Sequence, residues 1–222
     1  MLAMGGAAHA QGVSPQLKAV LDKMDAASRS FRSAQADFRW EYYEKIVHDT
    51  TTQTGSIYFQ REGGGTEMGA VITDPAAKNK VVKAIHFKGA ELQMFDPGVD
   101  QVTVLNEATN QAQIESFLTL GFGAGGSELA KVWNITDLGP ETIDGTATEK
   151  LDLVNKDPEA RKTVLHVTIW IDPTRAIALK QIAYQTGGNY RTATYSHIRL
   201  NAATDMSKFA FKTDKKTQTI RH

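Results

Sequence analysis

The amino-acid sequence predicts a mainly β protein with a few helices, an α+β fold built on one wide antiparallel sheet. Apolar and polar residues alternate in about ten or eleven segments, which is the periodicity of strands that bury one face. Glycine, proline and aspartate separate these segments, as in the turns of antiparallel hairpins. The long intervening helices that parallel βαβ units need are missing from the pattern. The chain of 222 residues is therefore expected to form one domain over residues 11–222.

The first predicted element is an amphipathic helix. Ser14 and Pro15 place a capping hydroxyl directly before a proline at the first helical position. The apolar side chains that follow recur at helical spacing, which indicates a helix with one buried face. They are Leu17, Val20, Leu21, Met24 and Phe31.

At residue 34 the period changes from helical to alternating. Residues 34–43 place Phe38, Trp40 and Tyr42 on one side of a long strand and mostly polar side chains on the other. The basic residues 212–222 have little apolar content, so we expect a solvated end there. Further strands are predicted, in chain order, at 54–60, 66–72, 80–87, 91–95, 101–105, 134–142, 146–155, 163–172, 176–185 and 190–200.

Residues 110–133 interrupt the β pattern. Phe117 and Leu118 lie at the spacing of one short helix, and Ser127 is expected to cap a second helix that leads to Trp133. The glycine-rich residues 121–126 between them match G-x-G-x-x-G, but no buried strand precedes them. We therefore interpret this segment as a flexible connection and not as a dinucleotide site.

The composition argues against several classes of protein. Twenty-five Lys and Arg balance 25 Asp and Glu, so the electrostatic basis for a nucleic-acid partner is missing. The chain has no cysteine, which excludes disulfides, thiolate metal sites, a catalytic thiol and a lipid-modified N-terminal cysteine. The sequence predicts no bound cofactor, no metal and no catalytic residue.

Histidine leaves one alternative to that prediction open. None of the six histidines forms a close ligand pair. His86, His166 and His197 fall in predicted strands and can in principle converge on a zinc ion. Singly hydrogen-bonded histidines are the simpler interpretation.

The N-terminus resembles the end of a signal peptide. Residues 1–10 are small and apolar, and Ala8-His9-Ala10 fits the small-x-small pattern that precedes cleavage. We expect residues 1–10 to be a signal-peptide remnant and the mature chain to be exported.

Apolar side chains gather on one side of the predicted sheet. The sealed core of an ordinary protein produces this pattern. However, one sheet this wide curls, and three short helices leave part of its concave side unfilled, which favours a hollow for apolar ligands. The strand residues assigned to this side are Phe38, Trp40, Tyr42, Ile57, Phe59, Met68, Ile72, Ile85, Phe87, Leu92, Met94 and Ile169.

The order of these parts resembles the outer-membrane lipoprotein carrier family, LolA and its LolA-like relatives. The resemblance covers essentially residues 14–220. It depends on the order and spacing of three pieces, none of which is specific alone. They are GSIYFQR at 55–61, KGAELQMFDP at 88–97 and DMSKFAF at 205–211.

The resemblance implies an incomplete antiparallel β-barrel covered by a helical lid. In that family the cavity holds the acyl chains of a lipoprotein that crosses the periplasm, between an inner-membrane ABC-type release complex and an outer-membrane acceptor. The family's strand-end arginine, which helps to hold the lid, falls on Arg61. Family members usually have proline next, whereas this chain continues Glu62-Gly63. This departure bears on lid control and on the identity of the cargo.

The leading interpretation is a monomeric, non-enzymatic periplasmic carrier of acylated lipoproteins or other lipids. Without an acylated cysteine, the chain is a candidate shuttle. Residues 121–126 would act as the hinge of the lid. Beyond the strand residues given above, the predicted ligand contacts are Phe117, Leu118, Phe122 and Trp133.

Two alternatives remain open. Similar folds form domains of regulators that bind mislocalised lipid or lipoprotein and then change partner. A small cofactor-free enzyme would instead need polar residues on the concave face, where the pattern offers only Lys83 and some strand histidines.

Overall fold

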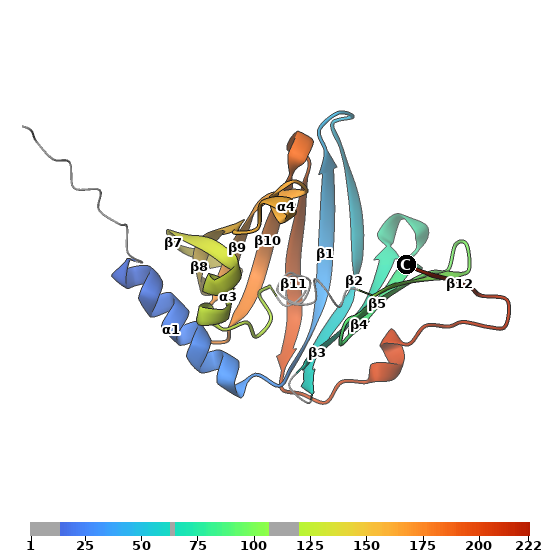
Figure 1. The fold of residues 1–222 in the computed structure, drawn as a ribbon, viewed down its shortest axis with the longest axis horizontal. Helices are drawn as coiled ribbons and strands as arrows, with labels where there is room; N and C mark the ends of the chain where they lie inside the picture. The colour runs from blue at the N-terminus through green and yellow to red at the C-terminus, as the bar shows by residue number, and fades with distance from the viewer. Residues whose placement is uncertain (1–13, 63–64, 107–119) are drawn as a thin grey trace, which may run out of the picture.

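The computed structural model describes residues 14–62, 65–106 and 120–222, and it contains one twelve-stranded sheet (Figure 1). The strand order is β12-β6-β5-β4-β3-β2-β1-β11-β10-β9-β8-β7. The strands are β1 (Ser33–Glu44), β2 (Asp49–Glu62), β3 (Gly65–Asp74), β4 (Lys80–Lys88), β5 (Glu91–Asp96), β6 (Gln101–Asn106), β7 (Trp133–Ile143), β8 (Thr146–Asn155), β9 (Val164–Asp172), β10 (Ile177–Gln185), β11 (Tyr190–Leu200) and β12 (Gln218–Arg221).

Short helices accompany this sheet. α1 (Pro15–Ser30) precedes β1, and α3 (Gly126–Val132) leads into β7. In the described ranges, no helix has both the length and the apolar character needed to cross a bilayer. The remaining helical turns are η1 (Pro75–Ala77), α4 (Pro158–Arg161), η2 (Thr186–Gly188) and η3 (Met206–Phe209).

The predicted fold class and the predicted strands are confirmed. Every pair of neighbours in the sheet is antiparallel except β12 and β6, and the sheet curls without closing, as an incomplete barrel does (Figure 1). The sequence placed each of the first eleven strands, although β2 begins five residues earlier than predicted, at Asp49.

The predicted solvated end of the chain is exposed, but part of it also forms a strand that was not predicted, because β12 pairs in parallel with β6 from Gln218 to Arg221. One local prediction is wrong. Ser127 does not cap α3, since Gly125 occupies the N-cap position. Asp25 of α1 supplies the capping oxygens instead, accepting hydrogen bonds from the Ser127 backbone at 3.0 Å and from its hydroxyl at 2.5 Å.

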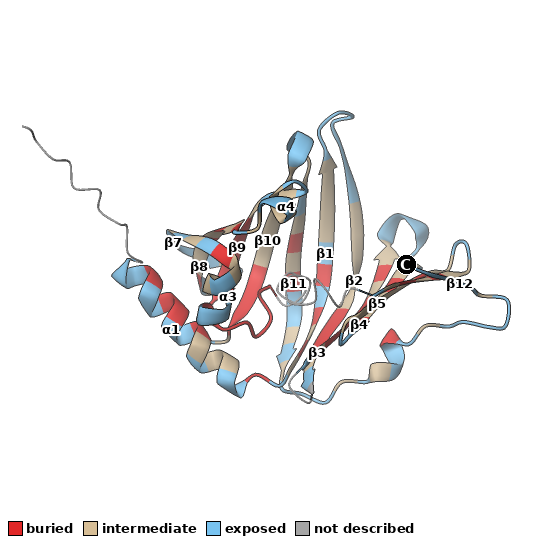
Figure 2. Ribbon diagram, in the orientation of Figure 1, coloured by how far each residue is buried: buried red, intermediate tan, exposed pale blue. Residues whose placement is uncertain are grey.

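The α1 helix forms as predicted and closes one half of the sheet. Ser14 caps it by accepting a hydrogen bond from the Leu17 backbone at 3.1 Å, with Pro15 in the first turn. The helix lies over β7, β8 and β9, together with α3 (Figures 1 and 2). We call the face that α1 covers the inner face and the opposite one the outer face. The core under α1 is formed by Leu17, Val20, Leu21, Met24, Leu120, Ala124, Leu129, Trp133, Leu151, Leu153, Val167, Ile169 and Ile171.

The C-terminal segment, residues 201–217, crosses the outer face of the other half of the sheet (Figure 1). Phe209 lies 4.5 Å, ring centre to ring centre, from Tyr58 on β2. Phe211 lies 5.8 Å from Phe95 on β5 in the same way. The F-x-F residues therefore fasten this segment to the sheet by aromatic contacts.

We predict that Phe209→Ala destabilises the protein by about 3 kcal/mol, because the Phe209 side chain is only 4 % exposed and its removal leaves a cavity over Tyr58. Urea denaturation followed by circular dichroism measures this change. Lys212→Ala, a change of an exposed residue in the same segment, is the control and should shift the free energy of unfolding by less than about 0.5 kcal/mol. Equal effects of the two changes would contradict the prediction.

Candidate ligand-binding face

The strand register places the predicted apolar residues on the inner face. Phe59 on β2 lies opposite Met68 on β3, and Met68 lies opposite Phe87 on β4. Ile85 on β4 likewise lies opposite Met94 on β5. Residues that are directly opposite across a strand pair share a face, so the same face continues from β1 to β5. The remaining predicted residues on it are Phe38, Trp40, Tyr42, Ile57, Ile72 and Leu92.

Burial divides this part of the inner face into two zones (Figure 2). One zone is buried and forms a second core cluster around Phe31, Phe38, Ile57, Phe59, Met68, Ile72, Phe87 and Phe122. The other zone borders this cluster and is half-buried, which leaves apolar surface in contact with solvent. Its members are Trp40, Tyr42, Ile85, Leu92 and Met94.

The structure places Trp133 and Ile169 away from this half-buried zone. Both belong to the core under α1, with 1 % and 0 % of their surfaces exposed. In this conformation they contact the protein's own side chains, so a ligand would reach them only if α1 moved. Phe117 and Leu118 lie outside the described residues, and their predicted role stays a prediction.

Phe122 inserts into the buried zone from the glycine-rich segment. Its ring stacks on Phe59 with centres 4.4 Å apart and meets Tyr195 edge-on at 4.8 Å. Gly121 and Gly123 have φ values of +84° and +75°, which glycine adopts without strain. The glycines thus let the chain turn twice and place one aromatic ring against the sheet.

Hydrogen bonds fix the glycine-rich segment to β10. The Gly123 N–H donates to the Ala176 carbonyl at 2.8 Å, and the Ala178 N–H donates to the Gly121 carbonyl at 2.7 Å. The Gln181 side chain donates to the Leu120 carbonyl at 2.5 Å. The predicted hinge is therefore held in place in this conformation.

Arg61 joins the three parts that meet at the end of β2. Its guanidinium donates to the Ser28 carbonyl of α1 at 2.7 Å and to the Gly123 carbonyl at 2.5 Å. The same group lies 5.3 Å from the centre of the Phe31 ring. One side chain thus connects the sheet, the end of α1 and the glycine-rich segment, which is the position that the family resemblance assigns to lid control.

We predict that Arg61→Gln loosens α1 and the glycine-rich segment. Loss of the charge-assisted hydrogen bonds to Ser28 and Gly123 should increase hydrogen exchange at the Phe31 and Gly123 amides by roughly tenfold or more. Hydrogen-exchange NMR measures both amides. Arg39→Gln, which removes an exposed arginine paired with Glu41, should leave them unchanged. Unaltered exchange in both variants would show that Arg61 does not hold these parts.

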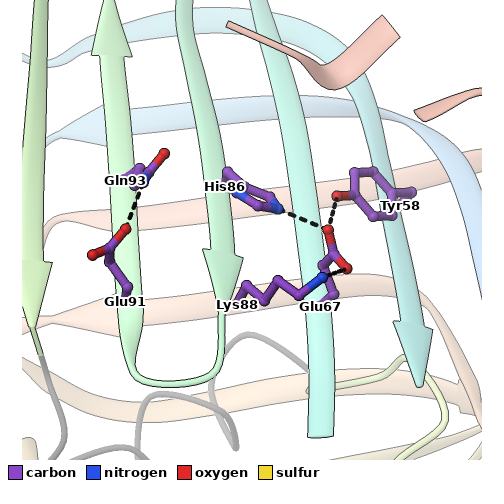
Figure 3. A network of polar contacts seen from close by, with 6 residues as sticks. All are labelled: Tyr58, Glu67, His86, Lys88, Glu91 and Gln93. Carbon is purple, nitrogen blue, oxygen red and sulfur yellow. Dashed lines mark hydrogen bonds and ion pairs between the residues drawn. The ribbon is translucent and has the colours of Figure 1, made fainter. Parts of the chain in front are cut away.

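Buried charge lies on the outer face. Glu67 on β3 is 11 % exposed and is surrounded by donors (Figure 3). The Tyr58 hydroxyl donates to it at 3.2 Å, His86 contacts it at 2.8 Å and Lys88 at 3.0 Å. Burial raises the pKa of Glu67, but the hydrogen bonds and charges of His86 and Lys88 outweigh burial, so its pKa lies below the ordinary 4.5. The network helps to fix the sheet under the C-terminal segment.

We predict that Glu67→Gln lowers the free energy of unfolding by about 1–3 kcal/mol at pH 7. Because the folded-state pKa of Glu67 is lowered, its contribution is present above about pH 4.5 and is lost as the pH falls toward the folded-state value. Urea denaturation at several pH values should therefore show a smaller loss of stability on acidification in the variant than in the wild type. Glu159→Gln, at an exposed ion pair with Lys162, should retain the wild-type acid dependence.

The strand histidines do not converge. His86 contacts Glu67, His166 contacts Asp152 at 2.7 Å, and His197 contacts Asp37 at 3.0 Å. Each histidine thus has its own carboxylate partner on a different part of the sheet. Among the described residues, no group of three or more histidines and carboxylates is arranged to hold a metal ion.

Sequence reasoning missed one functional candidate, Arg191 on β11. Its guanidinium lies over two predicted inner-face residues, 5.4 Å from the ring centre of Trp40 and 5.5 Å from that of Tyr42. The alternation of β11 carried the signal, because Ala193 and Tyr195 occupy the apolar side of the same strand. Arg191 lies on the same side of β11, nearer the start of the strand.

No family model and no curated protein matches the sequence. Solved structures do match. An uncharacterized conserved protein from Thermus thermophilus has a TM-score of 0.57 at 9 % identity, covering 93 % of this chain and 99 % of that one. MucB in the Pseudomonas aeruginosa MucA/MucB complex has a TM-score of 0.52 at 16 % identity, covering 88 % and 61 %. The neighbours also include LolA superfamily protein NE2245 from Nitrosomonas europaea, with a TM-score of 0.42 at 16 % identity, covering 88 % and 97 %.

These likenesses concern the fold. At such identities a shared fold says nothing by itself about ligand or partner.

Proposed function

We propose that this protein is a periplasmic carrier that binds the acyl chains of lipoproteins or other lipids and moves them from the inner to the outer membrane. The observation that carries the proposal is the half-buried apolar zone of Trp40, Tyr42, Ile85, Leu92 and Met94, continuous with the buried cluster on β1–β4. An extended hydrocarbon chain is the ligand that such a surface favours, since the half-buried residues of β1 and of β4 and β5 flank the buried apolar cluster.

The energetics of hydrocarbon favour a reversible carrier. Each methylene removed from water contributes about 0.8 kcal/mol, so an acyl chain gains several kcal/mol even when only part of it lies on this zone. A partly covered chain is held less tightly than a fully enclosed one. Such a carrier can release its cargo to an acceptor with a deeper apolar site.

Arg61 and the glycine-rich segment provide the controllable part of the site. Withdrawal of Phe122 from between Phe59 and Tyr195 would extend the apolar zone into the buried cluster. The hydrogen bonds of Arg61 to Ser28 and Gly123 oppose that movement. An inner-membrane ABC-type complex and an outer-membrane acceptor are the proposed loading and receiving partners.

The proposed activity is binding and transfer without covalent chemistry. The buried carboxylate Glu67 and its partners His86 and Lys88 lie on the outer face, away from the apolar zone. Lys83, the polar candidate on the inner face, is opposite the apolar Ile72. The inner face therefore favours the shape and polarity of a lipid tail.

We predict that Trp40→Glu or Met94→Glu weakens the binding of a fluorescent fatty acyl probe by roughly tenfold or more, because either change places a charge where hydrocarbon would lie. Fluorescence titration measures the affinity, and circular dichroism checks that each variant is folded. Val99→Glu, in a turn where the side chain is 65 % exposed, is the control and should bind like the wild type. Full affinity in both inner-face variants would contradict the proposed site.

A lipid-sensing regulatory domain is the second candidate. The MucA/MucB complex, in which MucB shares the fold, favours it. A carrier should pass a bound probe to acceptor vesicles, whereas a sensor should keep the probe and bind a protein partner. Probe transfer measured by energy transfer to labelled vesicles separates the two.

A further inference from the structure

Arg191 marks the point where the apolar inner face ends. It lies opposite Tyr42 in the β1–β11 pairing and therefore shares the inner face with Tyr42 and Trp40. Its guanidinium is close to both rings, at 5.4 and 5.5 Å from their centres. One residue pair further inward, Phe38 is 3 % exposed.

Beyond Arg191, at the ends of β1 and β10, the neighbouring groups are polar. The Tyr42 hydroxyl donates to the Gln185 side chain at 3.2 Å and accepts from the Asn189 side chain at 3.1 Å. Asn189 in turn accepts from the Lys45 backbone at 3.0 Å. A lipid whose tail lay along the apolar zone would therefore have its headgroup near Arg191.

The guanidinium retains its capacity to bind an anion. Within the described part of the chain, no carboxylate lies within 4.0 Å of its nitrogens and no hydrogen bond uses its donors. Stacking on aromatic rings occupies the face of a guanidinium and leaves the N–H edge available. That edge matches two oxygens of one phosphate or carboxylate.

We propose that Arg191 binds an anionic headgroup, so that the cargo is an acyl lipid that carries a phosphate or carboxylate next to its tail. The inference rests on the proposed carrier function and adds the class of cargo to it. Trp40 and Tyr42 position the guanidinium, and the apolar zone binds the tail.

The experiment measures affinities for two pairs of fluorescent lipids with matched tails. Phosphatidylglycerol is compared with diacylglycerol, and a free fatty acid with its methyl ester. The wild type should bind the charged member of a pair roughly tenfold more tightly, and Arg191→Gln should remove that preference without weakening the neutral member. Preference within one pair alone identifies the headgroup as phosphate or as carboxylate.

Two matched variants control for charge. Arg199→Gln removes an arginine of the same strand that lies opposite Gln35 on the outer face, and should retain the preference. Lys83→Gln removes an inner-face cation on β4, opposite Ile72, and should retain the preference as well. High salt should reduce the wild-type preference, which tests the inference even if Arg191→Gln folds poorly.

The outcomes separate the two proposals. Equal affinity for both members of each pair overturns the headgroup inference and leaves the carrier proposal standing. A preference that survives Arg191→Gln, or one that disappears in Lys83→Gln instead, overturns it too. Failure of every probe to bind the wild type removes the carrier proposal itself.

Discussion

The register of the antiparallel strands is the constraint on which the site depends. From β1 to β5 the pairing places the apolar residues of neighbouring strands on the same face, so a shift of one residue in any pair would turn part of the apolar zone outward. The inner face is tightly packed at Gly55. A side chain there would overlap the Phe38 ring and the Val71 backbone, so glycine keeps Phe38 flat on the sheet.

The inner face serves two purposes because α1 covers only part of it. Over β7–β9 the helix completes a sealed core, whereas on β1, β4 and β5 the residues Trp40, Tyr42, Ile85, Leu92 and Met94 stay half-buried beside the second core cluster. Asp25 of α1 also caps α3, so the two helices share hydrogen bonds that would break if they moved apart. Displacement of one helix would therefore carry the other with it, and Arg61 connects this pair to β2.

Local sequence patterns predicted the strands because alternation is a property of each strand by itself. These patterns failed where an element depends on a partner that is distant in the sequence. β12 is short and polar, and it forms because β6 offers an unpaired edge. Ser127 carried a capping signal, but Asp25, 102 positions away in the chain, took that role. Arg191 could be placed beside Trp40 and Tyr42 only once the pairing of β11 with β1 was known, since alternation gives the side of a strand on which a residue lies but not its neighbours.

An open sheet has two edges, and unpaired strand edges invite other chains to add to them. Here the two edges are protected differently. β12 is only four residues long and bears Arg221 beside Glu91, so it offers little backbone for another strand to pair with. At the other edge β7 is interrupted by a bulge between Asp137 and Pro140, and proline has no N–H to donate. The sheet can thus stay unclosed while resisting edge-to-edge aggregation with other copies of the protein.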